Sequence, residues 1–492
     1  MSETQKPFFE PTFNRAIKVR KKDLHITSDT GAILLREADH RLGITAALAD
    51  QMDDPRLQTS IRYKLVELIR ERLYALALGY SAQDDLDLLA HDPAMKASVW
   101  DRPGCNVSVE RLASQPTHSR LLNILTLSHN NREALRNSLP LAVIRHQQAS
   151  GNGHAVLRGT LDIDGFPVKV TGAQAGAAYN GYHRQTEYYP LAASFSAGGD
   201  YDHQRLGDGF VNALLRKGNA GGADGALRFI LNSVNKAKPL ARVLDIRIDA
   251  AFVIGAIMDP LCKRKIRFLG RLRDNKALQK MASEYLSRPV GRPPKEGYEQ
   301  VIELGGYQAK EWQYRQRVIL VIIDKPDANG QLKLFPDYFY IATNWKREER
   351  TTRELLEHYR ARGTFEDRLG EFNQAIGAHL SSPSFEANEA MLLLGLLAFN
   401  LAGILRGEVE SVSFDGWDLG RFQRSVLKVG GRLVKGGRRL WFDLAASAGP
   451  LWECLIKRMR RWREYWTKPA QPRPRQWVLL PRHAHRSPVL RL

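Results

Sequence analysis

Residues 241–249, ARVLDIRID, alternate apolar and charged side chains, which is the pattern of a half-buried β-strand. In such a strand Asp245, Arg247 and Asp249 share one face, and Asp249 stands at the end. The flanking segments continue the pattern, with helical spacing at 227–235 and 254–262 and a further strand pattern at 265–274. Strands that alternate with helices predict a mixed α/β core.

A second candidate strand, residues 155–164, runs into the sequence LDIDG. Its alternation places Asp162 and Asp164 on one face, with apolar residues on the other. Ligands of open α/β sheets gather at the carboxyl ends of strands, so Asp164 and Asp249 are candidate site residues. A single aspartate at a strand end is also common as a turn or cap residue, and this alternative stays open.

A third acidic residue, Glu366, lies in a segment with helical spacing, residues 354–376. At about 100° per residue, Tyr359, Arg362 and Glu366 fall on one stripe of that helix. The stripe combines a stacking surface, a phosphate-binding fork and a carboxylate, although an Arg–Glu pair at this spacing is also the usual surface salt bridge. Two strand-end aspartates and a helix glutamate in a basic chain suit two divalent cations positioned on a phosphodiester.

The rest of the chain divides by composition. Helical spacing dominates residues 30–146, and the polar stretch 147–153 places a boundary near residue 150. β-Branched and aromatic runs follow a Pro/Gly/basic connector at 287–297 and predict a β-rich insertion. The expected units are a helical domain at 1–150, an α/β core at 151–286 and 345–410, the insertion at 287–344, and a basic region with a tail at 411–492.

Composition excludes several classes of protein. The 492 residues suffice for about three domains, and 73 basic against 53 acidic residues leave a net charge of +20 that suits a polyanionic partner. Three cysteines without a CxxC pair exclude a disulfide framework and a cysteine-built zinc site, and they fit a reducing cytoplasm. The sequence has neither an apolar signal segment at its start nor a P-loop, so no nucleotide cofactor is expected.

The longest apolar stretch, residues 391–405, bears on membrane association. It has 15 residues, fewer than the about 20 that span a bilayer. We therefore expect a buried helix of a soluble protein and no membrane contact.

Several motifs follow one another in an order known from bacterial insertion sequences. They are LDIDG, GAAYNGY at 176–182, YPL at 189–191, RIDAAF at 247–252 and YRARGTFE at 359–366. In this order the chain resembles DDE-type insertion-sequence transposases. The upstream segments at 27–44, 70–96 and 112–123 look like the insertion-sequence family numbered thirteen-eighty, with a DDE domain of group 1. The resemblance covers about residues 22 to 405, and its motifs are specific as a set.

The resemblance implies a ribonuclease-H-like core with a β-rich insertion between the second aspartate and the glutamate. By position, the catalytic and metal-binding carboxylates would be Asp164, Asp249 and Glu366, with Asp162 as the alternative to Asp164. Two Mg²⁺ ions, replaceable by Mn²⁺, would bind there. The implied function is cleavage of the element's own ends, followed by joining of the freed 3′-OH to target DNA through two-metal phosphoryl transfer.

The implied partner is double-stranded DNA, both the terminal inverted repeats and the target. A homodimer on DNA in the bacterial cytoplasm, associated with the nucleoid, is expected from the resemblance. Two alternatives stay open: a metal-dependent nuclease of the same fold, and a non-catalytic DNA-binding repressor derived from such an enzyme.

Further DNA contacts are expected from four sources. The family's Tyr-Arg-Glu-Lys signature maps onto Tyr359, Arg362 and Glu366, but Asn373 stands at the lysine position. Trp345 could hold an unpaired base, with a core position as the alternative. Residues 421–439 contain no acidic side chain, and the expected phosphate contacts there are Arg421, Arg424, Lys435, Arg438 and Arg439. The basic tail would add contacts or, alternatively, serve only solubility.

Overall fold

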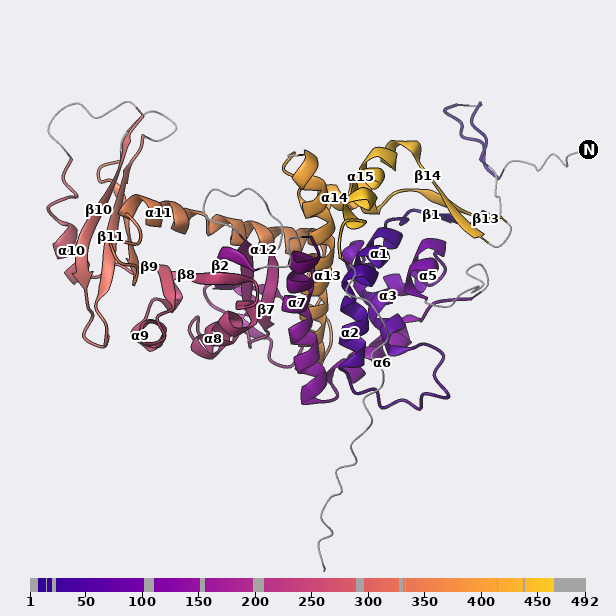
Figure 1. Cartoon of the computed structure of the whole chain (residues 1–492), viewed down its shortest axis with the longest axis horizontal. Helices are drawn as coiled ribbons and strands as arrows, with labels where there is room; N and C mark the ends of the chain where they lie inside the picture. The colour runs from indigo at the N-terminus through magenta and orange to yellow at the C-terminus, as the bar shows by residue number, and fades with distance from the viewer. Residues whose placement is uncertain are drawn as a thin grey trace, which may run out of the picture.

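The structure is a computed structural model, and in it the chain forms two halves joined by a long central helix (Figure 1). An α/β half lies at one end and a helical half at the other, with α13 (Phe385–Ser413) between them. The described residues are 8–14, 16–19, 24–100, 110–150, 155–197, 208–288, 296–326, 331, 333–413, 415–436 and 439–463.

The α/β half is built on one eight-stranded sheet in the order β10-β11-β12-β9-β8-β2-β6-β7. Strand β2 pairs in parallel with β8, and β8 pairs in parallel with β9. Strand β6 pairs antiparallel with β2, and β7 pairs antiparallel with β6. This mixed α/β fold confirms the predicted class, and the five strands from β7 to β9 are compatible with a ribonuclease-H-like core. Their bounds are β2 (Val156–Gly165), β6 (Leu191–Ala197), β7 (Gly209–Leu214), β8 (Ala241–Ile248) and β9 (Arg267–Leu272).

The other three strands lie in the segment that was expected to be β-rich. They are β10 (Tyr298–Tyr307), β11 (Gln316–Asp324) and β12 (Asp337–Thr343). Each pairs antiparallel with its neighbour, and β12 pairs antiparallel with β9. The segment therefore lengthens the central sheet at its β9 edge, and its described residues form no separate sheet of their own. A three-stranded sheet of β3 (Val168–Lys169), β4 (Ala178–Asn180) and β5 (Gln185–Tyr188) follows β2.

Helices cover both faces of the sheet. On one face, α8 (Ala226–Ala237) and α9 (Gly255–Lys263) share an apolar cluster with Leu161 and Ile163 of β2 and with Ile246 of β8. Because side chains alternate along a strand, the residues between these apolar ones face the other side. That side is covered by α11 (Thr352–Arg360) and α12 (Gly363–Ala375).

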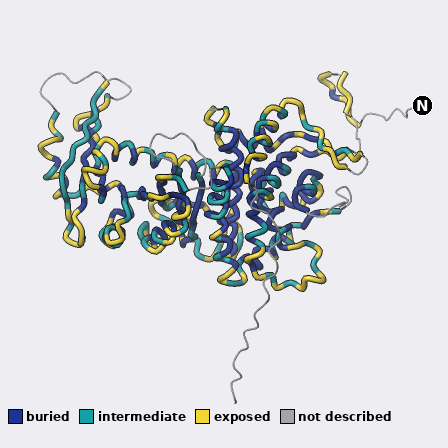
Figure 2. Tube along the Cα trace, in the orientation of Figure 1, coloured by how far each residue is buried: buried dark blue, intermediate teal, exposed yellow. Residues whose placement is uncertain are grey.

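The helical half combines the two ends of the chain. One apolar cluster runs from Ala32 to Trp462 and includes residues of α13, and Figure 2 shows buried residues concentrated along the middle of the molecule. The helices of this half are α1 (Ala32–Leu42), α2 (Ile44–Asp50), α3 (Leu65–Ala77), α4 (Asp85–Leu89), α5 (Pro93–Val99), α6 (Gln115–Thr126), α7 (His129–Ser150), α14 (Leu419–Phe422) and α15 (Gly449–Met459).

Two features of this half differ from the sequence expectations. The N-terminal region is not purely helical, because β1 (Ile26–Thr27) pairs with β13 (Gly431–Gly436), which pairs with β14 (Arg439–Leu444). The polar stretch near residue 150 also begins within α7, which packs against both α13 and β7. Both features depend on partners distant in sequence, which local composition does not reveal.

Helix α13 confirms the expected buried helix but is longer than its apolar stretch. It spans 29 residues and is long and apolar enough to cross a membrane, yet 89% of its most apolar window is buried inside the protein. Burial, rather than length, therefore distinguishes it from a membrane span. Asn400 fits this interior because its amide donates to Phe210 O and accepts from Phe210 N of β7, both at 2.8 Å.

A close backbone contact joins the start of α1 to the C-terminal region. Gly31 N donates to Leu427 O at 3.0 Å, and a Cβ on Gly31 would lie 2.3 Å from Leu427 Cα. We expect Gly31→Ala to lower the free energy of unfolding by about 1–3 kcal/mol, since rigid backbone must move to admit the methyl group. Chemical denaturation would measure this change. Gly403→Ala in α13 is the control, because its Cβ meets nothing within 4 Å; equal losses in both variants would contradict the close contact.

Candidate active site

Two strand-end aspartates come together on the sheet. Strands β2 and β8 are parallel, and Ile163 of β2 is paired with Ile248 of β8. The residues that follow this pair, Asp164 and Asp249, therefore lie side by side where the two strands end. Asp164 remains within β2, where its Oδ1 accepts from Gly165 N at 2.7 Å, and Asp249 precedes the 3₁₀ turn Ala250–Phe252.

The third predicted carboxylate, Glu366, lies in the first turn of α12. The prediction of one uninterrupted helix over residues 354–376 was wrong, because α11 ends at Arg360 and α12 begins at Gly363. The intervening turn is closed by short-range bonds, from Arg362 N to Tyr359 O at 3.0 Å and from Phe365 N to Arg362 O at 2.9 Å. Glycine has a weak helix propensity, and Gly363 is the local residue at which a break is least costly.

The break preserves the stripe that uniform helical spacing predicted. Bonds from residue i to i+3 wind the chain at about three residues per turn, which keeps Tyr359 and Arg362 on one side. Arg362 then reaches Glu366 across the first turn of α12, where the two side chains form an ion pair. The same guanidinium pairs with Asp164 Oδ2. Arg362 thus joins two of the three predicted carboxylates.

Burial and charge act together on Asp164. Its pKa is raised to about 6, chiefly because burial disfavours the charged form, while Arg362 lowers it and the charges of Asp249 and Glu366 raise it. The three carboxylates therefore interact electrostatically. The Asp164 side chain is 19% exposed and that of Glu366 is 63% exposed, so the group opens to solvent on the α12 side.

The donor chemistry of this group fits a hard divalent cation, because carboxylate oxygens are the preferred ligands of Mg²⁺. Within the described residues, however, no three His, Cys, Asp or Glu side chains stand close enough together to hold a metal ion. The guanidinium of Arg362 pairs with both Asp164 and Glu366 and lies between them.

A tyrosine and an arginine that charge alone did not indicate line the same region. Arg216 lies over the Tyr189 ring, with its Cζ 5.1 Å from the centroid, and its Nε donates to Tyr189 O at 2.9 Å. A Cβ on Gly165 would lie 2.8 Å from Tyr189 Cε1, so the ring packs against the end of β2. Burial raises the pKa of Tyr189, and Asp164 adds to this shift. The YPL motif marked Tyr189 in the sequence, whereas no motif marked Arg216.

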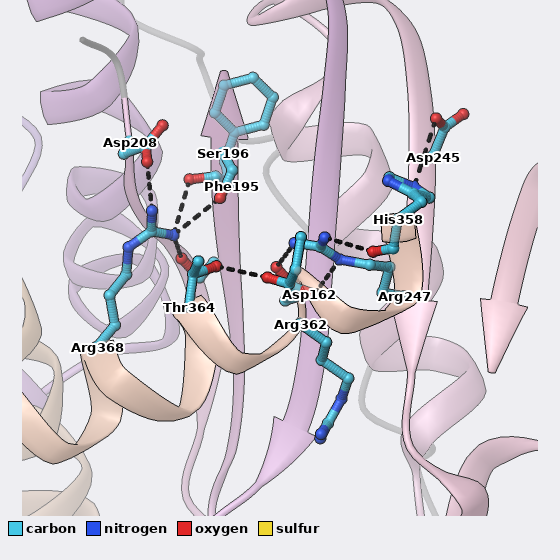
Figure 3. A network of polar contacts seen from close by, with 12 residues as sticks. Asp162, Phe195, Ser196, Asp208, Asp245, Arg247, His358, Arg362, Thr364 and Arg368 are labelled. Atoms are coloured by element: carbon cyan, nitrogen blue, oxygen red, sulfur yellow. Dashed lines mark hydrogen bonds and ion pairs between the residues drawn. The ribbon is translucent and has the colours of Figure 1, made fainter. Parts of the chain in front are cut away.

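Asp162, the alternative first ligand, lies in a different environment. Its side chain is fully buried and accepts two bonds from Arg247, from Nε at 2.7 Å and from Nη2 at 2.6 Å. Arg247 Nη1 also donates to His358 O of α11 at 2.8 Å, as Figure 3 shows. The Asp162–Arg247 pair therefore joins β2 to β8, and Arg247 extends the link to α11.

A second arginine fixes α12 over the sheet. Arg368 donates to Ser194 Oγ, to Phe195 O at 3.3 Å and to Ser196 Oγ at 3.1 Å, and it pairs with Asp208 (Figure 3). These contacts hold the helix against β6. Arg362 and Arg368 thus attach α12 to the sheet at two successive turns, which fixes the helix that carries Glu366.

Trp345 occupies the core position that was the alternative to a base-stacking role. It is 4% exposed and packs in an apolar cluster with Leu269 of β9, Ile341 of β12 and Leu355 of α11. Arg350 also lies over its ring, at 5.0 Å from the centroid. A base cannot reach the ring in this conformation.

The predicted phosphate contacts of the C-terminal region lie in the helical half, apart from the carboxylates. Among those described, four are exposed: Arg421, Arg424, Lys435 and Arg439. Arg421 belongs to α14 and lies 4.3 Å from the centroid of the Trp417 ring. Arg438 and the tail at 464–492 lie outside the described residues.

A cleft of about 300 Å³ is lined by Ala250, the residue that follows Asp249 in the chain. Its walls include the aromatic residues Tyr338 and Phe339, the exposed arginines Arg271 and Arg273, and the exposed carboxylate of Asp274. Arg271 Cζ lies 5.2 Å from the centroid of the Phe339 ring. Guanidinium groups beside carboxylates can bind the phosphates that flank a reacting phosphodiester.

Comparison with known families is consistent with this geometry. The sequence model described as transposase DDE domain group 1 matches residues 9–463, nearly the whole chain. No curated protein matches the chain.

Proposed function

Since this chain belongs to the transposases with a DDE domain of group 1, we propose that it cleaves the ends of its own insertion sequence and joins the freed 3′-OH to target DNA. The observation that carries this proposal is the meeting of Asp164 and Asp249 at the ends of two parallel strands, with Glu366 linked to Asp164 through Arg362. The proposed reaction is phosphoryl transfer without a covalent protein intermediate. The chain would supply positioning and charge stabilisation.

DDE transposases generally use divalent metal ions, and we propose Asp164, Asp249 and Glu366 as the residues that would hold two Mg²⁺ or Mn²⁺ ions here. Such ions would supply Lewis-acid stabilisation of the attacking and leaving oxygens. Asp164 is preferred to Asp162 because Arg247 already occupies both oxygens of the buried Asp162. Arg362 would exchange its two carboxylate partners for the phosphate beside the cut, where its fork matches phosphate oxygens.

The proposed DNA path starts at the cleft lined by Ala250, where Arg271 and Arg273 would neutralise phosphates. Exposed basic residues of the helical half, including Arg421, Arg424, Lys435 and Arg439, would extend it. The helical N-terminal region is proposed to bind the element's ends, and pairing of two ends by a homodimer stays a prediction.

One assay separates this function from its alternatives. A duplex that carries the element's end, already nicked so that the 3′-OH is free, is incubated with the protein, plasmid DNA and Mg²⁺. Joining of the end to the plasmid is the expected result. A nuclease of the same fold would cut an intact end without joining the nicked one, and a non-catalytic repressor would bind the end and do neither.

Arg362 offers a test of the proposed phosphate contact. We expect Arg362→Ala to raise the activation free energy of end cleavage by about 1.5–3 kcal/mol, the range of one charge-assisted hydrogen bond. Binding of the end duplex should change little. Single-turnover cleavage and fluorescence anisotropy would measure the two quantities. Arg353→Ala is the control, because this exposed arginine of α11 pairs with Glu299 and Glu357 away from the carboxylates. Wild-type cleavage by Arg362→Ala would mean that Arg362 only balances the charge of the carboxylates.

A further inference from the structure

A cleft of about 570 Å³ lies in the helical half, between the segment that precedes α3 and helix α6. Four arginines line it, namely Arg56, Arg62, Arg111 and Arg120, and none of its lining residues is acidic. Helices α6 and α12 lie on different sides of α13 in Figure 1. The cleft is therefore separate from the carboxylate group.

The arginines differ in how far their charge is already balanced. Arg56 pairs with Asp54 through Nε and Nη2, both at 2.8 Å, and its Nη1 donates to Tyr63 O at 3.0 Å. The side chains of Arg111 and Arg120 are exposed and make no hydrogen bond or ion pair with any residue that the structure describes. Two guanidinium groups at the cleft thus retain their capacity to bind an anion.

The cleft also has an apolar wall that a simple anion site would not need. The buried Leu68, Leu112 and Leu121 line it, as does Leu57, which is 70% exposed. Tyr63 stands at the edge, where its hydroxyl oxygen lies 2.9 Å from Arg111 O and 3.0 Å from Leu112 O, so that its single proton is shared between the two carbonyls. A volume of about 570 Å³ lies within the range of sites that enclose a small organic ligand. The lining therefore suits a ligand that has both a phosphate and an apolar or aromatic part.

We propose that this cleft binds a nucleotide segment of DNA, with Arg111 and Arg120 on its phosphates and the apolar wall beside its sugar or base. The proposal rests on the proposed function in taking DNA as the substrate, and it adds a contact remote from the cut. Charge complementarity supports it, because the chain carries a net charge of +20 and the cleft has no acidic lining residue. The planar fork of arginine matches phosphate oxygens, whereas the tyrosine and leucines accept nonpolar surface.

The test is a double variant, Arg111→Ala with Arg120→Ala, compared with the wild-type chain for binding of the end duplex at several salt concentrations. We expect the affinity to fall by about tenfold or more, as for lost charge-assisted phosphate contacts. The log–log salt slope should become shallower by about 0.9 for each lost contact.

The matched control is Arg228→Ala with Arg264→Ala, two exposed arginines of the α8 and α9 region whose loss removes the same net charge. Equal affinities and slopes for the two double variants would overturn the proposal. A second arm adds thymidine monophosphate or inorganic phosphate alone and follows thermal unfolding. Stabilisation of the wild type but not of the Arg111/Arg120 variant, together with unchanged DNA binding, would assign the cleft to a free phosphate ligand and would also overturn the proposal.

The test of the cleft can still be interpreted if the proposed function is wrong. Binding and thermal unfolding do not require cleavage, so a chain that never cuts DNA can still reveal whether the cleft contacts it. Conversely, a cleft that does not bind DNA would leave the cleavage assay unaffected.

Discussion

Asp164→Asn, Asp249→Asn and Glu366→Gln are each expected to lower the rate of end cleavage in Mg²⁺ or Mn²⁺ by about a thousandfold or more. Bound cations contribute several kcal/mol of charge stabilisation, and about 1.4 kcal/mol corresponds to each tenfold in rate. An amide keeps the size of the side chain but lacks its negative charge. Binding of the end duplex should remain near that of the wild type, because these residues are carboxylates and bind no phosphate directly. Single-turnover cleavage of a labelled end duplex and anisotropy titrations would measure both effects.

Asp367→Asn is the control for the loss of a carboxylate at this place in the chain. Asp367 is exposed and follows Glu366 directly in α12, so its replacement changes net charge without touching the proposed ligands. Wild-type cleavage by any two of the three ligand variants would refute the assignment. Loss of cleavage in a folded Asp162→Asn variant, with an active Asp164→Asn variant, would instead move the first ligand to Asp162.

The ends of β2 and β8 could be predicted because their alternation is strict. Leu161 and Ile163 are fully buried against α8, and this period of two placed Asp162 and Asp164 on the opposite face. The pattern could not show that the two aspartates differ in environment, since that depends on pairing with β8. In the register of that pairing Asp162 stands opposite Arg247. Opposite charges on two expected strands were the available signal for this contact.

The break between α11 and α12 shows a different limit. The helical pattern is recognised from apolar and charged side chains that recur about every 3.6 residues. A turn of three residues shifts this recurrence by less than one position across the break. The stripe of Tyr359, Arg362 and Glu366 was therefore found although the uninterrupted helix was wrong. The packing of α7 and β1 against the C-terminal region could not be found in this way, because their partners lie hundreds of residues away.

Arg247→Met is expected to lower the free energy of unfolding by about 3–5 kcal/mol, the range measured when one partner of a buried ion pair is removed. Asp162 is 0% and Arg247 is 4% exposed, so the variant leaves the Asp162 carboxylate without a counter-ion in an environment that water does not reach. Denaturant unfolding would measure the loss. A stability equal to the wild type would mean that the Asp162–Arg247 ion pair contributes no net stabilisation.

Replacing both partners separates stability from positioning. In Asp162→Leu with Arg247→Met no charge remains buried, and apolar side chains of similar size often restore or exceed the original stability. Cleavage by the double variant should nevertheless be slower than by the wild type, because the bond from Arg247 Nη1 to His358 O is lost. This bond anchors α11, the helix that leads through Arg362 to Glu366. Arg247→Lys alone, with Asp162 retained, keeps the positive charge but lacks the two-pronged guanidinium. Its cleavage rate should lie between those of the wild type and the double variant. A stable double variant that cleaves at the wild-type rate would show that Arg247 holds the sheet together without positioning the carboxylates.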